Sequence, residues 1–317
     1  MRIVRSLDEY RADADIMLTI GVFDGVHIGH RAVLDRLAAQ RKPGLIVGAL
    51  TFVQHPQEFL HPGEGPKVLT TVDEKINLLD SCGLDVLFLL TFDERIQRLA
   101  PETFLDDVLL RRLRTRRIVV GENWRFGKER AGDVAFASSF LKPKGCSVES
   151  ADLLESGGEK VSSSRIRELI SSRRFAEADE LLGSAYTLRG VVSGGEGRGH
   201  LLGFPTANLS TAPEKLVPPP GVYGATARHD GADREAVVSI GDKPTFGGAH
   251  NVVEVYVLDF RRSIYGEQMG LREWNFVRDQ VRYDGPAQLI EQMRRDVAAV
   301  RDRDRRVTVP PQAARAD

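Results

Sequence analysis

The sequence predicts two domains of different fold class: a parallel α/β sheet, followed by an antiparallel β-sheet or small β-barrel that ends in a helix. Three observations lead to this prediction. Up to about residue 182, short apolar runs alternate with helix-like stretches. After about residue 184, similar runs are joined by turns rich in Gly, Pro and Asp instead. A single amphipathic pattern follows near the C-terminus.

The first half contains short runs rich in leucine or β-branched residues, which we interpret as strands: MLTIGVF, LIVGALTF, VLFLLTF and RIVVG. Helix-like stretches lie between them, at about 31–40, 73–81 and 101–113. Strands separated by helices of this length indicate βαβ units and a parallel sheet that is buried on both faces. Pro101 followed by Glu102 suits the first turn of a helix.

The second half reads as strands without intervening helices: YTLRGVVSG, GVYGATARHD, EAVVSIG and VVEVYVLDF. This succession favours an antiparallel sheet or a small barrel. A helix is predicted at about 286–301, where Pro286 suits the start and one face is apolar, formed by Leu289, Ile290, Met293, Val297 and Val300. We place the boundary near Gly183 and expect domains at 1–183 and 184–305, with a disordered tail at 306–317.

The composition is that of a soluble globular enzyme, with 42% apolar and 28% charged residues. The 44 basic and 45 acidic side chains nearly cancel, which argues against a nucleic-acid backbone as the main partner. No apolar run approaches the roughly 20 residues of a membrane helix, and the first residues lack the apolar segment of a secretory signal. Cys82 and Cys146 match no metal or redox spacing. We therefore expect a cytoplasmic protein without nucleic-acid or membrane partners.

The first chemical signal is GVFDGVHIGH, residues 21–30, directly after the first predicted strand. A glycine-rich turn from a strand into a helix directs backbone N–H groups and the positive helix end at an anion. Gly21 and Gly25 permit the tight turns of such a nucleotide-binding loop, and Gly29 allows a phosphate to approach the backbone. His27 and His30 are three residues apart, so both can face one ligand and donate hydrogen bonds to a reacting phosphate chain.

A plainer interpretation of the same motif is that one histidine caps the helix and the other is a satisfied surface group. The strand before the motif, the helix after it and the glycines within it favour the phosphate site.

The first half also resembles a known family. TIGVFDGVHIGH, TFVQHP (51–56), VVGENWRFG (119–127) and VSSSRIREL (161–169) are similar, in order, to the FMN adenylyltransferase module of bacterial FAD synthetases, within the H-x-G-H nucleotidylyltransferases. The resemblance implies a catalytic role for His27 and His30. It implies contacts to nucleotide or flavin phosphates from Phe23, Asp24, His55, Asn123, Ser163, Ser164 and Arg167.

The serine-rich segment suits this role physically, because serine hydroxyls cap helices and bind phosphate, while Arg167 can clamp a phosphate with two hydrogen bonds. Alone, SSSRIR reads only as a helix start with a basic residue. The chain departs from the family at Val53 and Gln54, where an acidic residue and a proline are usual. Ser164 replaces a threonine but keeps the hydroxyl group.

The second signal is GGEGRGHLLGFPTANL, residues 194–209. Five glycines within ten residues, with Arg198 among them, form a loop able to fold over phosphates. Thr206 and Asn208 alternate along an extended chain, so both point the same way. Their hydroxyl and amide oxygens are hard ligands that suit Mg²⁺. The glycine loop alone is better explained as a turn-rich connection between barrel strands.

LGFPTANL resembles the riboflavin kinase signature, and GVYGATA, SIGDKPTF and VVEVYVLDF follow as in that family. The resemblance implies that Thr206 and Asn208 bind the magnesium nucleotide and that Glu254 is the general base for the ribityl 5′-hydroxyl. The neighbouring residues predicted to bind nucleotide or flavin are Gly197, Arg198, Gly199, Gly203 and Pro205. By strand alternation alone, Glu254 could instead face solvent. Lys243 and Gln280 stand where asparagine and glutamate are common in the family.

The family implies a Rossmann-like nucleotidylyltransferase domain followed by a six-stranded β-barrel. The barrel would transfer the ATP γ-phosphoryl group to riboflavin, and the first domain would join FMN to the ATP α-phosphorus. The expected small molecules are ATP, riboflavin, FMN and FAD, with Mg²⁺ as cofactor and at most weak self-association. Three rival functions are a non-catalytic flavin-binding barrel, an adenylyltransferase for a pantetheine or nicotinate nucleotide, and a structural or RNA-associated protein.

Overall fold

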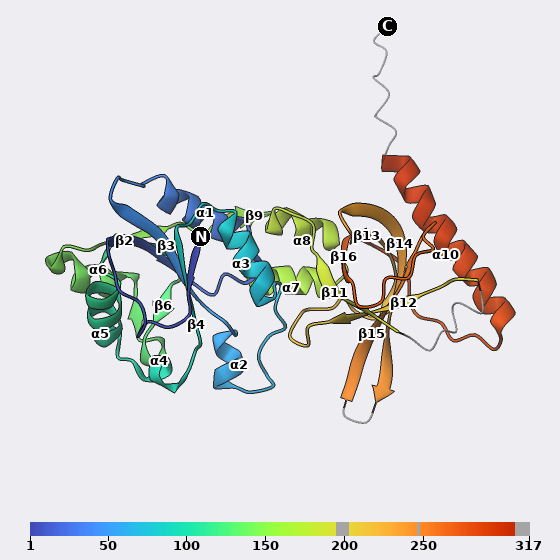
Figure 1. The fold of residues 1–317 in the computed structure, drawn as a ribbon, viewed down its shortest axis with the longest axis horizontal. Coiled ribbons are helices and arrows are strands. Elements are labelled where there is room, and N and C mark those ends of the chain that lie inside the picture. Colours follow the sequence, from blue (N-terminus) through green and yellow to red (C-terminus); the bar gives the residue numbers. More distant parts are fainter. Residues whose placement is uncertain (195–202, 246–247, 308–317) are drawn as a thin grey trace, which may run out of the picture. The chain divides into compact units, whose positions relative to one another are not determined.

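The computed structural model describes residues 1–194, 203–245 and 248–307 of the chain (Figure 1). The chain divides into two compact units. The first comprises Met1–Ile166 and Leu181–Gly183, and the second comprises Arg167–Glu180 and the residues from Ser184 onward. In what is described, no helix combines the length and apolar character that crossing a membrane requires.

The first unit contains a sheet of six parallel strands in the order β1-β4-β3-β2-β5-β8. These strands are β1 (Arg2–Val4), β2 (Asp15–Ile20), β3 (Leu45–Phe52), β4 (Val86–Leu90), β5 (Thr115–Gly121) and β8 (Ser147–Ala151). Leu18 and Met17 of β2 belong to different apolar clusters, because successive side chains of a strand point to opposite faces. The predicted parallel sheet, buried on both faces, is confirmed.

Helices connect these strands, as the periodicity predicts. The longer ones are α1 (Ile28–Ala38), α3 (Val72–Asp80), α6 (Val134–Leu141) and the π-helical η2 (Phe104–Arg112), which continues α5 (Pro101–Thr103). Two more helices, α7 (Ser163–Ser171) and α8 (Phe175–Leu182), follow β8, the last strand of the sheet. The shorter ones are η1 (Asp24–Val26), α2 (Pro56–Leu60), α4 (Glu94–Arg98), η3 (Lys128–Arg130) and η4 (Lys142–Lys144). Two small hairpins pair β6 (Arg125–Phe126) with β7 (Gly132–Asp133) and β9 (Glu155–Ser156) with β10 (Glu159–Lys160).

The second unit contains a closed antiparallel barrel in the order β11-β12-β15-β14-β13-β16, which confirms the predicted barrel. Its strands are β11 (Leu188–Ser193), β12 (Ala207–Thr211), β13 (Gly221–His229), β14 (Ala232–Thr245), β15 (Gly248–Val257) and β16 (Gln268–Arg278). Helix α10 (Pro286–Val307) begins at the predicted proline and packs on the barrel. The side chain of Val300 lies against Gly224 of β13. A Cβ atom added at Gly224 would be only 3.0 Å from the Val300 side chain.

Helix α10 runs beyond the predicted end at residue 301 and includes the first two residues of the predicted tail. The rest of that tail, residues 308–317, lies outside the described residues.

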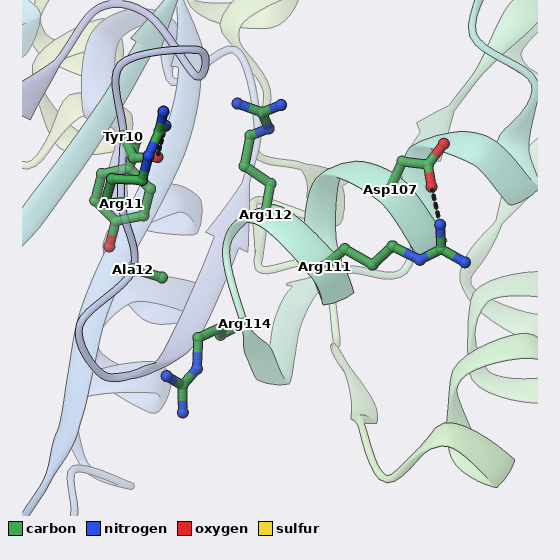
Figure 2. Close-up of a pocket in the computed structure, with 7 residues that line it drawn as sticks. All are labelled: Tyr10, Arg11, Ala12, Asp107, Arg111, Arg112 and Arg114. Carbon is green, nitrogen blue, oxygen red and sulfur yellow. Dashed lines mark hydrogen bonds and ion pairs between the residues drawn. The ribbon is translucent and has the colours of Figure 1, made fainter.

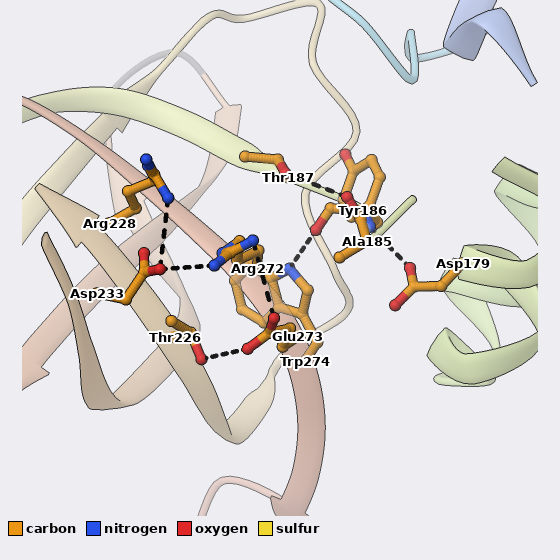
Figure 3. A network of polar contacts seen from close by, with 10 residues as sticks. All are labelled: Asp179, Ala185, Tyr186, Thr187, Thr226, Arg228, Asp233, Arg272, Glu273 and Trp274. Carbon is orange, nitrogen blue, oxygen red and sulfur yellow. Dashed lines mark hydrogen bonds and ion pairs between the residues drawn. The ribbon is translucent and has the colours of Figure 1, made fainter. Parts of the chain in front are cut away.

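The two units interleave around the predicted boundary at Gly183, because residues 167–180 group with the barrel. The Phe175 ring packs against the rings of Tyr223 and Trp274, at centroid distances of 5.9 and 6.1 Å. Asp179 accepts a 2.7 Å hydrogen bond from the backbone N–H of Tyr186 (Figure 3).

The barrel strands are also joined by a polar network, in which Arg272 and Arg228 both contact Asp233 (Figure 3). In the same network, the Thr226 hydroxyl donates a 2.6 Å hydrogen bond to Glu273. These contacts link β13, β14 and β16 on the surface of the barrel.

Candidate active sites

The predicted phosphate loop follows the carboxyl end of β2 and leads through η1 into α1. Phe23 has φ 51° and Val26 has φ 40°, both in the left-handed region, and Gly25 has φ 81°. A β-branched residue such as Val26 is a rare occupant of this region. Strained backbone of this kind persists only where the surroundings hold it in place, and it is concentrated at functional sites.

Buried contacts hold this loop. The Asp24 carboxylate, 3% exposed, accepts hydrogen bonds from the backbone N–H groups of Leu69 and Thr70 at 2.9 and 3.0 Å. The Thr70 hydroxyl accepts one from Gly25 N–H at 3.0 Å, and the Ser163 hydroxyl donates to the Asp24 carbonyl at 2.9 Å. Asp24 and Ser163 therefore anchor the loop from within. The direct phosphate contacts implied for them stay predictions.

The two motif histidines are stacked, with ring centroids 3.7 Å apart and an interplanar angle of 19°. His27 caps α1, because its Nδ1 accepts a 3.3 Å hydrogen bond from His30 N–H. The helix-capping interpretation is thus correct for His27. It does not exclude the phosphate role, because an Nδ1 acceptor in a neutral ring leaves the hydrogen on Nε2, which can donate.

Both imidazoles are neutral at pH 7. Burial lowers the pKa of His27 to about 4, against the opposing effect of the Asp24 carboxylate. Burial also lowers the pKa of His30 well below its usual value, and the charges of His27 and Lys75 add to this. His30 Nδ1 is buried and has no hydrogen-bonding partner among the described residues. The pair therefore offers neutral ring N–H donors rather than permanent positive charge.

The remaining predicted residues of the first site follow neighbouring strands. His55 comes after β3 and caps α2, accepting a 3.2 Å hydrogen bond from Gln57 N–H. Asn123 is exposed just after β5. Since β2 lies between β3 and β5, the loops after these parallel strands share one edge of the sheet, where α/β proteins bind ligands. Ser164 is exposed at the start of α7, and Arg167 lies one turn further along that helix.

The departure at Val53 and Gln54 has a structural explanation. Val53 packs partly buried against the apolar cluster on one face of the sheet. Gln54 donates a 2.8 Å hydrogen bond from Nε2 to the carbonyl of Phe92, just beyond β4. These two residues therefore stabilise the ends of two adjacent strands.

Sequence reasoning missed Lys75 of α3, which is 5% exposed beside the loop. Its Nζ donates to the carbonyls of Phe52 and Val22 at 2.7 and 3.2 Å. The available signal was its helical spacing from Val72 and Leu79, which places a lysine on the buried stripe of an amphipathic helix.

The second candidate site lies on one face of the barrel wall. Glu254 of β15 is directly opposite Asn208 of β12 and Ser239 of β14. Residues opposite each other in an antiparallel pair project to the same face. Val253 and Val255 are 2% and 1% exposed, so Glu254 projects away from the apolar interior and is half-buried. The strand alternation is thus as the solvent-facing interpretation expects. The two residues directly opposite Glu254, Asn208 and Ser239, are polar.

The oxygen atoms on this face are suitable ligands for Mg²⁺. Asn208 donates from Nδ2 to the carbonyl of Gly194 at 3.4 Å, which leaves its Oδ1 as an acceptor. The hydroxyl of Thr206, which alternates with Asn208 along the extended chain, is the second hard oxygen ligand of the predicted pair. Within the described ranges, no group of three or more His, Cys, Asp or Glu side chains is placed to hold a metal ion. Mg²⁺ commonly shares its coordination with waters and substrate phosphates.

The other predicted kinase residues are only partly described. Gly203, with φ 83°, and Pro205 are exposed before β12. Gly197, Arg198 and Gly199 lie outside the described residues, as does the side chain of Lys243. Gln280 donates from Nε2 to the Ser239 hydroxyl at 2.9 Å and to the Ile240 carbonyl at 3.1 Å. A glutamate at this position could not make either donation, because an ionised carboxylate only accepts.

An open cavity of about 610 Å³ lies elsewhere on the first unit (Figure 2). It is lined by Tyr10, Arg11, Ala12, Asp107, Arg111, Arg112 and Arg114. Several of these residues directly precede β2 and β5, so the cavity belongs to the amino-terminal edge of the parallel strands. Arg111 is paired with Asp107 and Arg114 with Asp15. This cavity is separate from the strand ends that carry the predicted residues.

Two family models match the chain in succession. One described as FAD synthetase matches residues 9–165, and one described as riboflavin kinase matches residues 182–303. A bifunctional riboflavin kinase/FMN adenylyltransferase of Listeria monocytogenes is 33% identical over 294 residues, covering 91% of this chain and 92% of the relative. The protein of the same name from Escherichia coli K12 is 33% identical over 288 residues, covering 90% and 92%.

The fold is also similar to that of a solved protein. A crystal structure titled as a macrolide-efflux protein from Streptococcus pneumoniae has a TM-score of 0.84 and 28% sequence identity to this chain. The similarity covers 94% of this chain and 98% of that one.

Proposed function

The chain belongs to the family of bifunctional riboflavin kinase/FMN adenylyltransferases, and from this premise we propose how its two units divide the two reactions. The enzyme phosphorylates riboflavin with ATP to give FMN and ADP. It then joins FMN to the AMP part of a second ATP, giving FAD and diphosphate. The barrel unit, with which residues 167–180 group although they precede the predicted boundary near Gly183, performs the first reaction. The parallel-sheet unit performs the second.

FMN adenylylation is best supported by the neutral, stacked pair of His27 and His30 in the strained loop after β2. An oxygen of the FMN phosphate attacks the ATP α-phosphorus, and the bond to the leaving diphosphate breaks. His27 and His30 donate hydrogen bonds to oxygens that gain charge in this displacement. His55 and Asn123 orient the nucleotide and flavin phosphates, since holding two anions in line is much of the work of such a transfer.

Riboflavin phosphorylation is supported by the position of Glu254 opposite Asn208 on the barrel. Glu254 accepts the proton of the ribityl 5′-hydroxyl while that oxygen attacks the ATP γ-phosphorus and ADP leaves. Thr206 and Asn208 would hold Mg²⁺, which neutralises phosphate charge when bound. Gln280 keeps Ser239 in place beside Glu254. The residues before β12 orient the flexible ribityl chain of riboflavin.

The two cysteines bear on our proposal for the cellular setting. Cys82 and Cys146 are unpaired, and Cys146 is buried. Burial raises the pKa of the Cys146 thiol to about 11, so it is inert packing rather than a redox group. We propose a cytoplasmic location on this basis, together with the expected use of ATP.

The direct test is incubation of the purified chain with riboflavin, ATP and Mg²⁺, followed by chromatography of the flavins. FMN should form first and FAD should follow. A second incubation that supplies FMN instead of riboflavin isolates the adenylylation step. Recovery of neither product would refute the assignment, and FAD formation from FMN without phosphorylation of riboflavin would support the rival of a non-catalytic barrel.

A further inference from the structure

Lys75 makes contacts that are unusual for a lysine. It lies in the middle of α3, is 5% exposed, and directs its ammonium at two backbone carbonyls, Phe52 O at 2.7 Å and Val22 O at 3.2 Å. Phe52 is the last residue of β3, and Val22 is the second residue after β2. The Val22 carbonyl also accepts a 3.0 Å hydrogen bond from the Thr51 hydroxyl. One side chain thus joins the ends of two adjacent strands.

The burial of this charge is not offset by an ion pair. In the part of the chain that the structure describes, no carboxylate lies within ion-pair distance of Lys75 Nζ. A buried ammonium without a paired charge is costly, and an apolar side chain would fill the same stripe of α3 at lower cost. Burial lowers the pKa of Lys75 to about 8, although the Asp24 carboxylate acts in the opposite direction. A costly charge retained beside a binding loop suggests a functional reason.

The loop beside Lys75 is the strained segment that carries the histidine pair. Val22 immediately precedes Phe23, the first left-handed residue of that segment. Phe23 packs edge-on against the His30 ring, with centroids 5.1 Å apart. Asp24 and Thr70 fix the middle of the loop, whereas Lys75 fixes its first peptide. Lys75 is also the cation that acts on His30.

We propose that Lys75 is a positioning residue for FMN adenylylation, which fixes the start of the histidine loop through its hydrogen bonds to the Val22 and Phe52 carbonyls. Its charge also acts on the His30 imidazole and favours the neutral ring. This inference rests on the proposed function. The groups that bear on His30 are His27 from its own loop and Lys75 from α3. Asp24, the acid that acts on His27 and Lys75, is held by Leu69 and Thr70.

Two substitutions separate the parts of this role. Lys75→Met keeps the shape of the side chain but removes the charge and both donations. Lys75→Arg keeps a charge that persists at high pH. Lys42→Met, at an exposed lysine of the same unit, is the matched control. FMN formation from riboflavin reports on the barrel unit alone. A urea-unfolding midpoint of the first unit, compared with that of the parent, reports whether the unit that carries Lys75 is folded.

Steady-state rates with FMN, ATP and Mg²⁺ should show a kcat for Lys75→Met reduced by about 10–10²-fold, because misplacement of a reacting group by about 1 Å costs up to 10²-fold. KM values should change far less. The acid limb of the kcat/KM profile should move to higher pH in Lys75→Met, since His30 then protonates more easily. It should return toward the parent position in Lys75→Arg.

The His30 imidazole can also be titrated by NMR, which requires no turnover. Its pKa should rise in Lys75→Met relative to the parent and stay low in Lys75→Arg. An unchanged His30 titration would overturn the proposal. A kcat and pH profile equal to those of the parent would also overturn it. If the parent itself makes no FAD, the proposed function fails, and the NMR titration still decides the role of Lys75.

Discussion

Phe175 provides a sharp test of where the kinase unit begins. It lies before the predicted boundary at Gly183, yet its ring is 4% exposed and packs on Tyr223 and Trp274 of the barrel. Truncating a buried phenylalanine to alanine typically costs about 3–5 kcal/mol. We therefore expect Phe175→Ala to destabilise the barrel unit by that amount. A fragment that begins at Ser184 should lose these contacts too, and should be less stable than one that begins near residue 167.

In the assay, the rates of FMN formation and of FAD formation are each measured at increasing concentrations of urea, so that each rate reports the unfolding of one unit. FMN formation from riboflavin should be lost at a lower urea concentration in Phe175→Ala, while FAD formation from FMN should keep nearly its parent midpoint. Phe88→Ala, at a fully buried phenylalanine of β4, is the matched control and should show the opposite selectivity. A Phe175→Ala variant that loses FAD formation first would refute the assignment of α8 to the kinase unit.

Four further predictions address the sites. Asp24→Asn should destabilise the first unit by about 1.5–3 kcal/mol in thermal or urea unfolding, since hydrogen bonds to a buried charged acceptor are lost. A cost no larger than that of Asp93→Asn, at the half-buried cap of α4, would contradict its anchoring role. His30→Ala should reduce FAD formation by about 10²–10³-fold and leave FMN formation nearly intact, and unchanged FAD formation would remove His30 from the site. Glu254→Gln should slow riboflavin phosphorylation by about 10²–10⁴-fold without raising KM, and a parent rate would leave Glu254 a solvated strand residue. His27, with a folded pKa of about 4 against 6.5 unfolded, should contribute stability above pH 6.5 that is lost as the pH falls toward 4, about 3 kcal/mol in all; unfolding at several pH values should show a flatter profile in His27→Gln.

The central strands of the first unit could be predicted because they are buried on both faces and consist almost entirely of apolar residues. β1 and β8 were not recognised. They are the two edges of the sheet, and the SVESA sequence of β8 has only one fully buried residue, Ala151. An edge strand pairs with a neighbour on one side only and can leave one face exposed. Its sequence therefore lacks the continuous apolar run by which a buried strand is recognised.

In the candidate sites, too, some residues could be predicted from the sequence and others could not. The glycines and histidines of the first loop are local in sequence, and their pattern was visible. The anchors of that loop were not, because Leu69 and Thr70 are about 45 positions from Asp24, and Lys75 is 53 positions from Val22. Such contacts depend on which strand lies beside which, and only the folded sheet order supplies that information.

The two candidate sites differ in how tightly function is linked to stability. In the first unit, the two motif histidines lie on a strained, buried loop, and buried polar groups such as Asp24 and Lys75 hold that loop. A substitution there removes a hydrogen bond from the interior, so stability and FAD formation should fall together. In the barrel, Glu254 projects from the wall and the apolar interior is formed by Val253 and Val255. Polar substitutions at Glu254 should therefore lower the rate of FMN formation. The free energy of unfolding should stay within about 0.5 kcal/mol of the parent value, as for ordinary surface positions. A large loss of stability in Glu254→Gln would show that the carboxylate supports the barrel rather than its chemistry.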